Sequence, residues 1–116
     1  MSKGYNLITN VIFKDVDMIK VVVGYKLKAG ANIQPILRKL RSNAITYPGF
    51  VSAENMVSTQ DNSVVFVLYT WDKITDWQLW ENANIRKKIL QEAEALLCEA
   101  PRVRIYRIMP TSGPQS

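Results

Sequence analysis

The chain has 116 residues, of which 47% are hydrophobic and 22% are charged, and its formal net charge is +5. These values are ordinary for a globular protein, and the length suits one domain with a single core. Histidine is absent and Cys98 is the only cysteine, which excludes Cys/His zinc sites, Ser-His-Asp and Cys-His nucleophilic systems, and an intrachain disulfide.

No apolar run approaches the roughly 20 residues that a membrane span requires, and the N-terminal residues lack the apolar core of a signal peptide. We therefore expect a cytoplasmic protein that has no membrane partner. The positive charge admits an anionic partner, but an excess of this size is common in soluble proteins, and we do not expect nucleic acid to bind.

The first half of the chain predicts an arm, a strand and a helix. Residues 1–17 form an N-terminal arm or edge segment. Met18–Lys28 follows as a strand, because apolar residues alternate along it. Ile33–Thr46 shows the apolar repeat of a helix, with Asn32 as its expected N-cap. Tyr47-Pro48-Gly49 ends this helix, since proline disfavours helix before it and glycine lets the chain turn.

The second half predicts two more strands, a long helix and a last strand. Phe50–Ser58 alternates, and Ser63–Trp71 is apolar on both faces, as in a central strand. A single helix is expected over Ile74–Leu97, capped by Asp72 or Thr75. Its apolar stripe contains Ile74, Trp77, Trp80, Ile85, Ile89, Ala93 and Leu96. Arg102–Met109 closes the sheet, residues 18–109 form one domain, and residues 110–116 form a flexible tail.

The order strand–helix–strand–strand–helix–strand is the ferredoxin-like plan, an α+β fold with an antiparallel sheet. Both helices would cover one face of that sheet and leave the other bare. Because the strands are apolar on both faces, the bare face favours association. We expect a homodimer whose two sheets face each other in an α+β barrel.

The chain resembles the antibiotic biosynthesis monooxygenase superfamily in its order of elements and in three stretches of sequence. These are the Tyr47-Pro48-Gly49-Phe50 turn, Trp71 beginning the second helix, and the ending Arg102-Val-Arg-Ile-Tyr-Arg-Ile-Met109. The resemblance covers about residues 18–109. It implies a dimeric α+β barrel. The superfamily includes cofactor-free oxygenases that form quinones and monooxygenases that degrade heme.

The heme-degrading branch is similar to this chain at one of three functional positions. Its asparagine, tryptophan and iron-binding histidine fall on Val23, Trp80 and Leu90. Leucine offers iron no lone pair, and the chain has no histidine to replace it. We therefore do not expect heme degradation.

The cofactor-free branch implies a pocket for a phenolic substrate between helices and sheet, with no cofactor and no metal. Aromatic walls and polar contacts would hold the deprotonated substrate. The candidate pocket residues are Trp80, Trp77, Trp71, Tyr25, Val23, Asn84, Arg86 and Asn55. Tyr69 could supply a further aromatic wall. No spacing identifies a catalytic residue. Glu54 and Glu81 are candidates for a base by residue type only.

Simpler interpretations stay open for these residues. Trp77 and Trp80 share a helical face and would equally serve as core or dimer-interface residues. The run Arg86-Lys87-Lys88 suits the solvated side of a helix, the alternative being that Arg86 turns inward toward an anion. Arg102, Arg104 and Arg107 could pair across the dimer with Glu92, Glu94 or Glu99.

Two other functions compete with the oxygenase hypothesis. One is a non-catalytic dimer of the same fold that binds a small molecule or acts as an accessory protein. The other is an RNA-binding ferredoxin-like domain, which requires aromatic residues within a basic, glycine-containing third strand. Ser63–Trp71 contains neither glycine nor a basic residue, so RNA binding is not expected.

Overall fold

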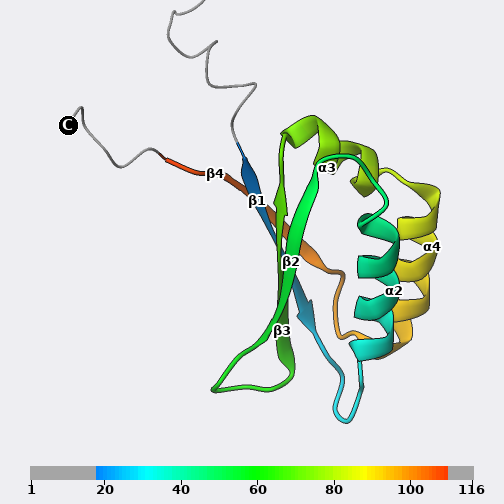
Figure 1. Ribbon diagram of the computed structural model, residues 1–116. Coiled ribbons are helices and arrows are strands. Elements are labelled where there is room, and N and C mark those ends of the chain that lie inside the picture. Colours follow the sequence, from blue (N-terminus) through cyan, green and yellow to red (C-terminus); the bar gives the residue numbers. More distant parts are fainter. Residues whose placement is uncertain (1–17, 110–116) are drawn as a thin grey trace, which may run out of the picture.

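Alternating apolar residues build a four-stranded antiparallel sheet with helices on one face (Figure 1). The structure is a computed structural model that describes residues 18–109, so the predicted arm and tail lie outside the described residues. Its elements are β1 (Ile19–Lys26), α2 (Gln34–Ala44), β2 (Phe50–Val57), β3 (Val64–Trp71), α3 (Ile74–Glu81), α4 (Asn84–Ala93), the 3-10 turn η1 (Glu94–Leu96) and β4 (Arg102–Arg107).

The strands lie in the order β2-β3-β1-β4, and every neighbouring pair is antiparallel. The predicted α+β, ferredoxin-like fold is therefore confirmed. The structure contains one chain, and the homodimer stays a prediction. Among residues 18–109, no helix is both long enough and apolar enough to cross a bilayer.

One face of the sheet forms the core with the helices. Tyr25 of β1 pairs with Val65 of β3, and Val21 pairs with Tyr69, so their side chains share the face that the helices cover. Leu40 of α2 is almost fully buried against this face. The alternating burial of β1 results directly from the period of two in its side chains.

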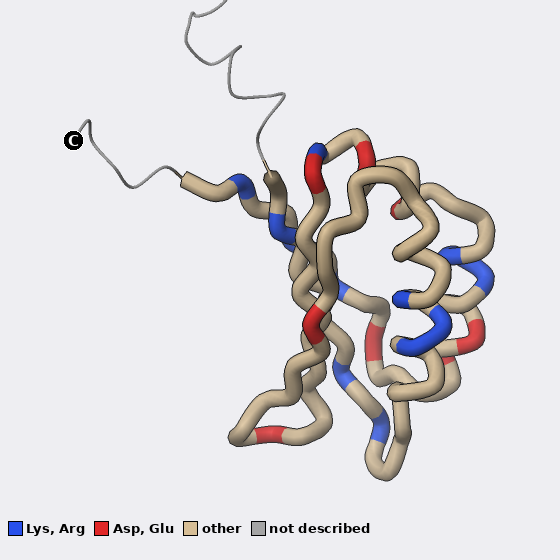
Figure 2. The backbone as a smooth tube through the Cα atoms, in the orientation of Figure 1, with Lys and Arg blue, Asp and Glu red and all other residues tan. Residues whose placement is uncertain are grey.

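The first helix begins close to the predicted position. The Oδ1 of Asn32 accepts a hydrogen bond from the backbone N–H of Gln34 at 3.0 Å, which satisfies a donor that the helix leaves unpaired. Pro35 lies in the first turn, where its missing N–H is tolerated. The Nζ of Lys39 pairs with the Oε1 of Glu92 at 2.8 Å and joins α2 to α4, on a helical layer where acidic and basic residues are interspersed (Figure 2).

The prediction of one helix over Ile74–Leu97 is wrong. The helix breaks after Glu81, and Ala83, with φ −68° and ψ 135°, is extended. The side chain of Asn82 donates to the carbonyl of Gln78 at 2.8 Å, a local bond that competes with continuation of the helix. Because the break rotates α4, Ile85 of the predicted apolar stripe is exposed. Ile74 at the start of α3 is exposed too.

Candidate functional site

The three tryptophans of the chain come together between α3 and the sheet. Trp71 is the last residue of β3, whereas Trp77 and Trp80 lie on α3, and all three side chains are fully buried. The ring centroids of Trp71 and Trp77 are 6.4 Å apart at an interplanar angle of 64°, an edge-on arrangement. The short turn from β3 into α3 therefore folds the strand end and the helix face onto each other.

The loop between α2 and β2 closes this end of the layer. Tyr47 packs edge-on against Trp80 with centroids 5.2 Å apart, and Phe50 packs edge-on against Trp71 at 5.5 Å. Gly49, with φ +84°, adopts a backbone conformation that other residues rarely reach. Its carbonyl accepts a hydrogen bond from the N–H of Asp72 at 2.8 Å, which fixes the loop to the end of β3.

Arg86 turns inward from α4, which corrects the expectation of a solvated Arg86-Lys87-Lys88 run. Only 9% of Arg86 is exposed, whereas Lys87 and Lys88 are exposed. Its guanidinium carbon lies 5.2 Å from the centroid of the Trp77 ring, within the range of a cation–π interaction. Its Nη1 also donates to the backbone carbonyl of Glu81 at 3.2 Å. The helix break therefore places one cation within an aromatic layer.

Two buried tyrosines from the sheet lie within reach of that charge. Burial raises the pKa of Tyr25 well above its ordinary value, Tyr69 raises it further, and the positive charge of Arg86 opposes the change. Burial also raises the pKa of Tyr69 to about 12, again against Arg86. The rings of Tyr69 and Trp77 are 6.1 Å apart. At neutral pH both phenols are therefore protonated, so they can donate hydrogen bonds but cannot act as bases.

The buried indole nitrogens are the unusual polar feature of this region. The Nε1 atoms of Trp71, Trp77 and Trp80 are buried and have no hydrogen-bond partner within the described part of the chain. Each buried donor left unpaired costs about 1–3 kcal/mol. We call the group of six side chains the aromatic cluster: Tyr25, Tyr69, Trp71, Trp77, Trp80 and Arg86.

The aromatic cluster contains five of the eight predicted pocket residues. Val23 lies beside it in the core, on the same face of β1 as Tyr25. Asn84, the first residue of α4, is exposed. Asn55 is also exposed, and it lines a separate hollow of about 300 Å³ at the β2 edge. A groove of about 390 Å³, lined among others by Phe66 and Arg104, lies on the sheet face that no helix covers. No tryptophan lines either hollow.

Of the two carboxylates considered as bases, one lies apart from the aromatic cluster and the other adjoins it. Glu54 is exposed on β2 and pairs across the sheet with Leu68, on the face that no helix covers. Glu81 reaches Arg86 through its backbone carbonyl. The closing contacts of Tyr47 and Phe50 were not predicted, although the Tyr-Pro-Gly-Phe turn marks the place where the chain must reverse over the helix start.

The fold agrees with solved structures of very different sequence. The chain is similar to SnoaB, a cofactor-independent oxygenase from Streptomyces nogalater, with a TM-score of 0.73 and 11% identity over 82% of this chain and 96% of that one. It is also similar to two proteins provisionally named antibiotic biosynthesis monooxygenases. The one from Caulobacter crescentus gives a TM-score of 0.73 and 16% identity over 91% and 97% of the two chains. The one from Nitrosomonas europaea gives a TM-score of 0.72 and 14% identity over 83% of this chain and 94% of that one.

The α+β, ferredoxin-like fold implied by the resemblance is confirmed by these structures, since 94–97% of each of those chains is matched by this one. The dimer that the resemblance also implies stays a prediction. No protein-family model matches the sequence, and the search of curated proteins gave no significant match. At 11–16% identity this likeness establishes the fold alone.

Proposed function

We propose that the aromatic cluster binds an aromatic, phenolic small molecule and that the protein is a cofactor-independent monooxygenase. The observation that supports this most is the position of Arg86, a buried cation facing two phenols and an indole ring. A buried cation without a carboxylate partner is unfavourable unless an anion compensates it. A phenolate oxygen from the substrate would supply that negative charge.

The protein groups would act mainly by binding and polarisation. The guanidinium of Arg86 stabilises a phenolate or enolate oxygen. The indole N–H groups and the protonated hydroxyls of Tyr25 and Tyr69 donate hydrogen bonds to oxygen atoms of the ligand. The tryptophan rings exclude water, which strengthens each of these interactions.

The proposed reaction takes its electrons from the substrate. A methylene group activated by the neighbouring phenolate loses its two hydrogens, one atom of O₂ becomes the new carbonyl oxygen, and the other leaves as water. The overall change is R₂CH₂ + O₂ → R₂C=O + H₂O, so no external reductant is consumed. Both buried tyrosines are protonated near pH 7 and cannot accept the first proton, so in the proposed reaction this proton leaves because the substrate itself is acidic.

Access to the aromatic cluster would require the loop between α2 and β2 to move. Tyr47 of this loop packs on Trp80, and Phe50, the first residue of β2 directly after the loop, packs on Trp71. Loops that open on a faster timescale than turnover commonly admit substrates to closed sites. We assign this loop as the gate. The single cysteine also suits a reducing cytoplasm, which we propose as the location.

The alternative is a binding or accessory protein that performs no chemistry. It is favoured by one observation: the candidate base Glu54 lies on the far side of the sheet from the aromatic cluster. A site with donors and a cation but no base would hold a phenolic molecule without converting it.

Oxygen uptake distinguishes the two functions. The purified protein is mixed with anthrone- and hydroquinone-type compounds in an oxygen electrode, and quinone formation is followed by absorbance. We expect uptake that Trp80→Phe reduces at least tenfold and that Leu79→Ala, an exposed neighbour on α3, leaves unchanged. Saturable binding without oxygen uptake for every compound would reject the oxygenase and leave the binding protein.

A further inference from the structure

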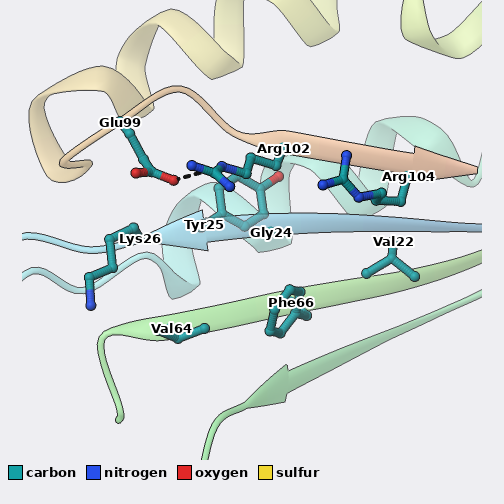
Figure 3. A pocket seen from close by; sticks show the side chains of 9 residues that line it. All are labelled: Val22, Gly24, Tyr25, Lys26, Val64, Phe66, Glu99, Arg102 and Arg104. Carbon is teal, nitrogen blue, oxygen red and sulfur yellow. Dashed lines mark ion pairs between the residues drawn. The ribbon is translucent and has the colours of Figure 1, made fainter.

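The groove that Phe66 and Arg104 line lies at one corner of the sheet, where β1 ends and β3 and β4 begin (Figure 3). Lys26 is the last residue of β1, Val64 is the first of β3 and Arg102 is the first of β4, and all three line the groove. Its volume of about 390 Å³ is typical of pockets that hold small molecules. Every lining residue belongs to the same chain, so the groove is complete without a partner subunit.

A glycine in β1 produces the hollow. Gly24 pairs with Phe66 on β3 and with Arg102 on β4, and residues paired across antiparallel strands lie side by side on one face. The Phe66 ring leans over the glycine, because a Cβ at position 24 would come within 3.0 Å of its Cε1. The row Phe66–Gly24–Arg102 therefore has an aromatic ring on one side and a guanidinium on the other, with no side chain from the strand between them.

The wall beside the hollow is apolar. Phe66 is 38% exposed, although β3 is an inner strand of the sheet. Val22 and Val64 lie next to it along the groove and are half-buried. An exposed ring in such a wall offers a flat apolar surface, and contacts between rings favour an aromatic ligand.

Three basic residues line the groove, and two of them have acidic partners. The Nζ of Lys26 lies 2.9 Å from the Oδ2 of Asp61, and the Nε of Arg102 lies 3.0 Å from the Oε2 of Glu99. Arg104 is exposed and makes no ion pair within residues 18–109. Figure 3 shows its guanidinium apart from the Arg102–Glu99 pair. The groove and the pairs around it therefore keep one uncompensated positive charge.

We propose that this groove binds an aromatic monoanion, a flat ring system that carries one carboxylate or sulfonate group. The ring of the ligand lies against Phe66 above Gly24, and its acid group points toward Arg104. Guanidinium groups bind planar carboxylates through two parallel hydrogen bonds. Arg102 and Arg104 are alternate residues of one strand, so about 7 Å separates their Cα atoms and one acid group lies within reach of both.

Other ligands fit the charge and shape of the groove less well. A dianion such as a phosphate ester would meet the carboxylate of Glu99 with only one free cation to offset its charge. A neutral aromatic molecule would leave Arg104 unpaired, and a short aliphatic acid would leave the Phe66 ring exposed. The groove lies across the sheet from the aromatic cluster, and it would bind its ligand whether or not the aromatic cluster catalyses a reaction.

Titration calorimetry with 2-naphthoate at low salt, where charges on the surface are little screened, tests the site. We expect one bound molecule per chain with a Kd of about 100 μM or lower. The Kd should rise at least fivefold in Arg104→Gln, which removes the free charge, and in Phe66→Leu, which removes the ring. Arg38→Gln, a change of the same kind at an exposed arginine of α2, is the matched control and should leave the Kd unchanged. 2-Naphthalenemethanol, which has the same ring without the charge, should bind at least tenfold more weakly.

A ¹H–¹⁵N correlation spectrum locates the bound anion. The backbone amides of Gly24 and Phe66 should shift with saturating 2-naphthoate, whereas the three indole resonances should stay in place. Circular dichroism checks that each variant is folded.

Three outcomes would overturn the proposal. The first is a wild-type protein that does not bind 2-naphthoate at 1 mM. The second is an Arg104→Gln or Phe66→Leu variant that binds as tightly as wild type. The third is binding that Arg86→Met abolishes and Arg104→Gln retains, which would place the anion at the aromatic cluster instead of the groove.

Discussion

The guanidinium carbon of Arg86 lies 5.2 Å from the centroid of the Trp77 ring, although the two residues belong to different helical segments. The same side chain donates to the carbonyl of Glu81 at the end of α3. Arg86 thus joins α3 to α4 and at the same time presents a positive charge to Tyr25 and Tyr69. Arg86 therefore both connects α3 with α4 and supplies the positive charge of the aromatic cluster.

Replacing Arg86 should change the affinity for a phenolic ligand without lowering the stability of the fold. Arg86→Met keeps most of the volume and removes a buried charge, so we expect the free energy of unfolding to stay within about 1 kcal/mol of wild type or to rise. Affinity for a phenolic ligand should fall at least tenfold. Urea unfolding and ligand titration measure the two quantities, with Lys88→Met on the exposed side of α4 as the control. A loss of more than about 2 kcal/mol with unchanged affinity would mean that Arg86 has only a structural role.

Alkaline solution should destabilise the protein through the buried tyrosines. Because their pKa values lie above the ordinary value of about 10, the folded state holds these protons more tightly than the unfolded chain does. For Tyr69 this contribution to stability is complete below about pH 10 and is lost, at about 1.4 kcal/mol per pH unit, as the pH rises toward about 12; Tyr25 acts in the same direction.

Tyr69→Phe isolates this effect in urea unfolding at pH 9.5, 10.5 and 11.5. We expect it to reduce the slope of stability against pH by about 1.4 kcal/mol per unit above pH 10. Tyr106→Phe, a variant of a half-exposed tyrosine on β4, is the control and should leave the slope unchanged. Equal slopes in the wild type and Tyr69→Phe would show that Tyr69 ionises in the folded protein as it does in the unfolded chain.

Two glycines with similar backbone angles should respond differently to alanine. Gly30 has φ +76° and nothing within 4 Å of an added Cβ, so Gly30→Ala meets only backbone strain of about 1–2 kcal/mol. Gly49 has φ +84°, and its added Cβ would collide with the side chain of Asp76. Urea unfolding should therefore show a larger loss for Gly49→Ala than for Gly30→Ala. Equal losses would mean that the loop between α2 and β2 yields without disturbing α3.

Turnover should not depend on added metal or organic cofactor. In the proposed reaction the substrate anion itself donates the electrons to O₂. Protein dialysed against EDTA and passed through a desalting column should keep its full rate of oxygen uptake. Recovery of a lost rate by a metal ion or a flavin would contradict this part of the mechanism.

Much of the fold could be predicted because its strands alternate and its turns are marked by glycine and proline. Ser63–Trp71, apolar on both faces, is the central strand β3 with one residue fewer. The break between α3 and α4 could not be predicted, because residues 74–97 contain no glycine or proline and keep a helical repeat. Asn82 and Asn84 were the available signal, since asparagine often ends or begins a helix.

The break between α3 and α4 also determines which residue of α4 faces the sheet. Two non-helical residues rotate α4, so that Arg86 rather than Ile85 faces the sheet. Arg86 is a candidate pocket residue by its charge, but in the sequence it is followed by two lysines that are exposed, so the sequence leaves its inward and its solvated orientations both open. The tryptophans could be predicted because large aromatic side chains at helical spacing nearly always face a neighbour.

The most direct test of the central claim uses the indole signals. The chain has three tryptophans, so a ¹H–¹⁵N correlation spectrum contains three indole resonances, from donors that lack a partner in residues 18–109. Under anaerobic conditions a saturating anthrone-type phenol should shift at least one indole proton downfield, and Trp77→Phe or Trp80→Phe would assign it. Three unchanged indole resonances at saturating ligand would contradict the proposal that the aromatic cluster is the binding site.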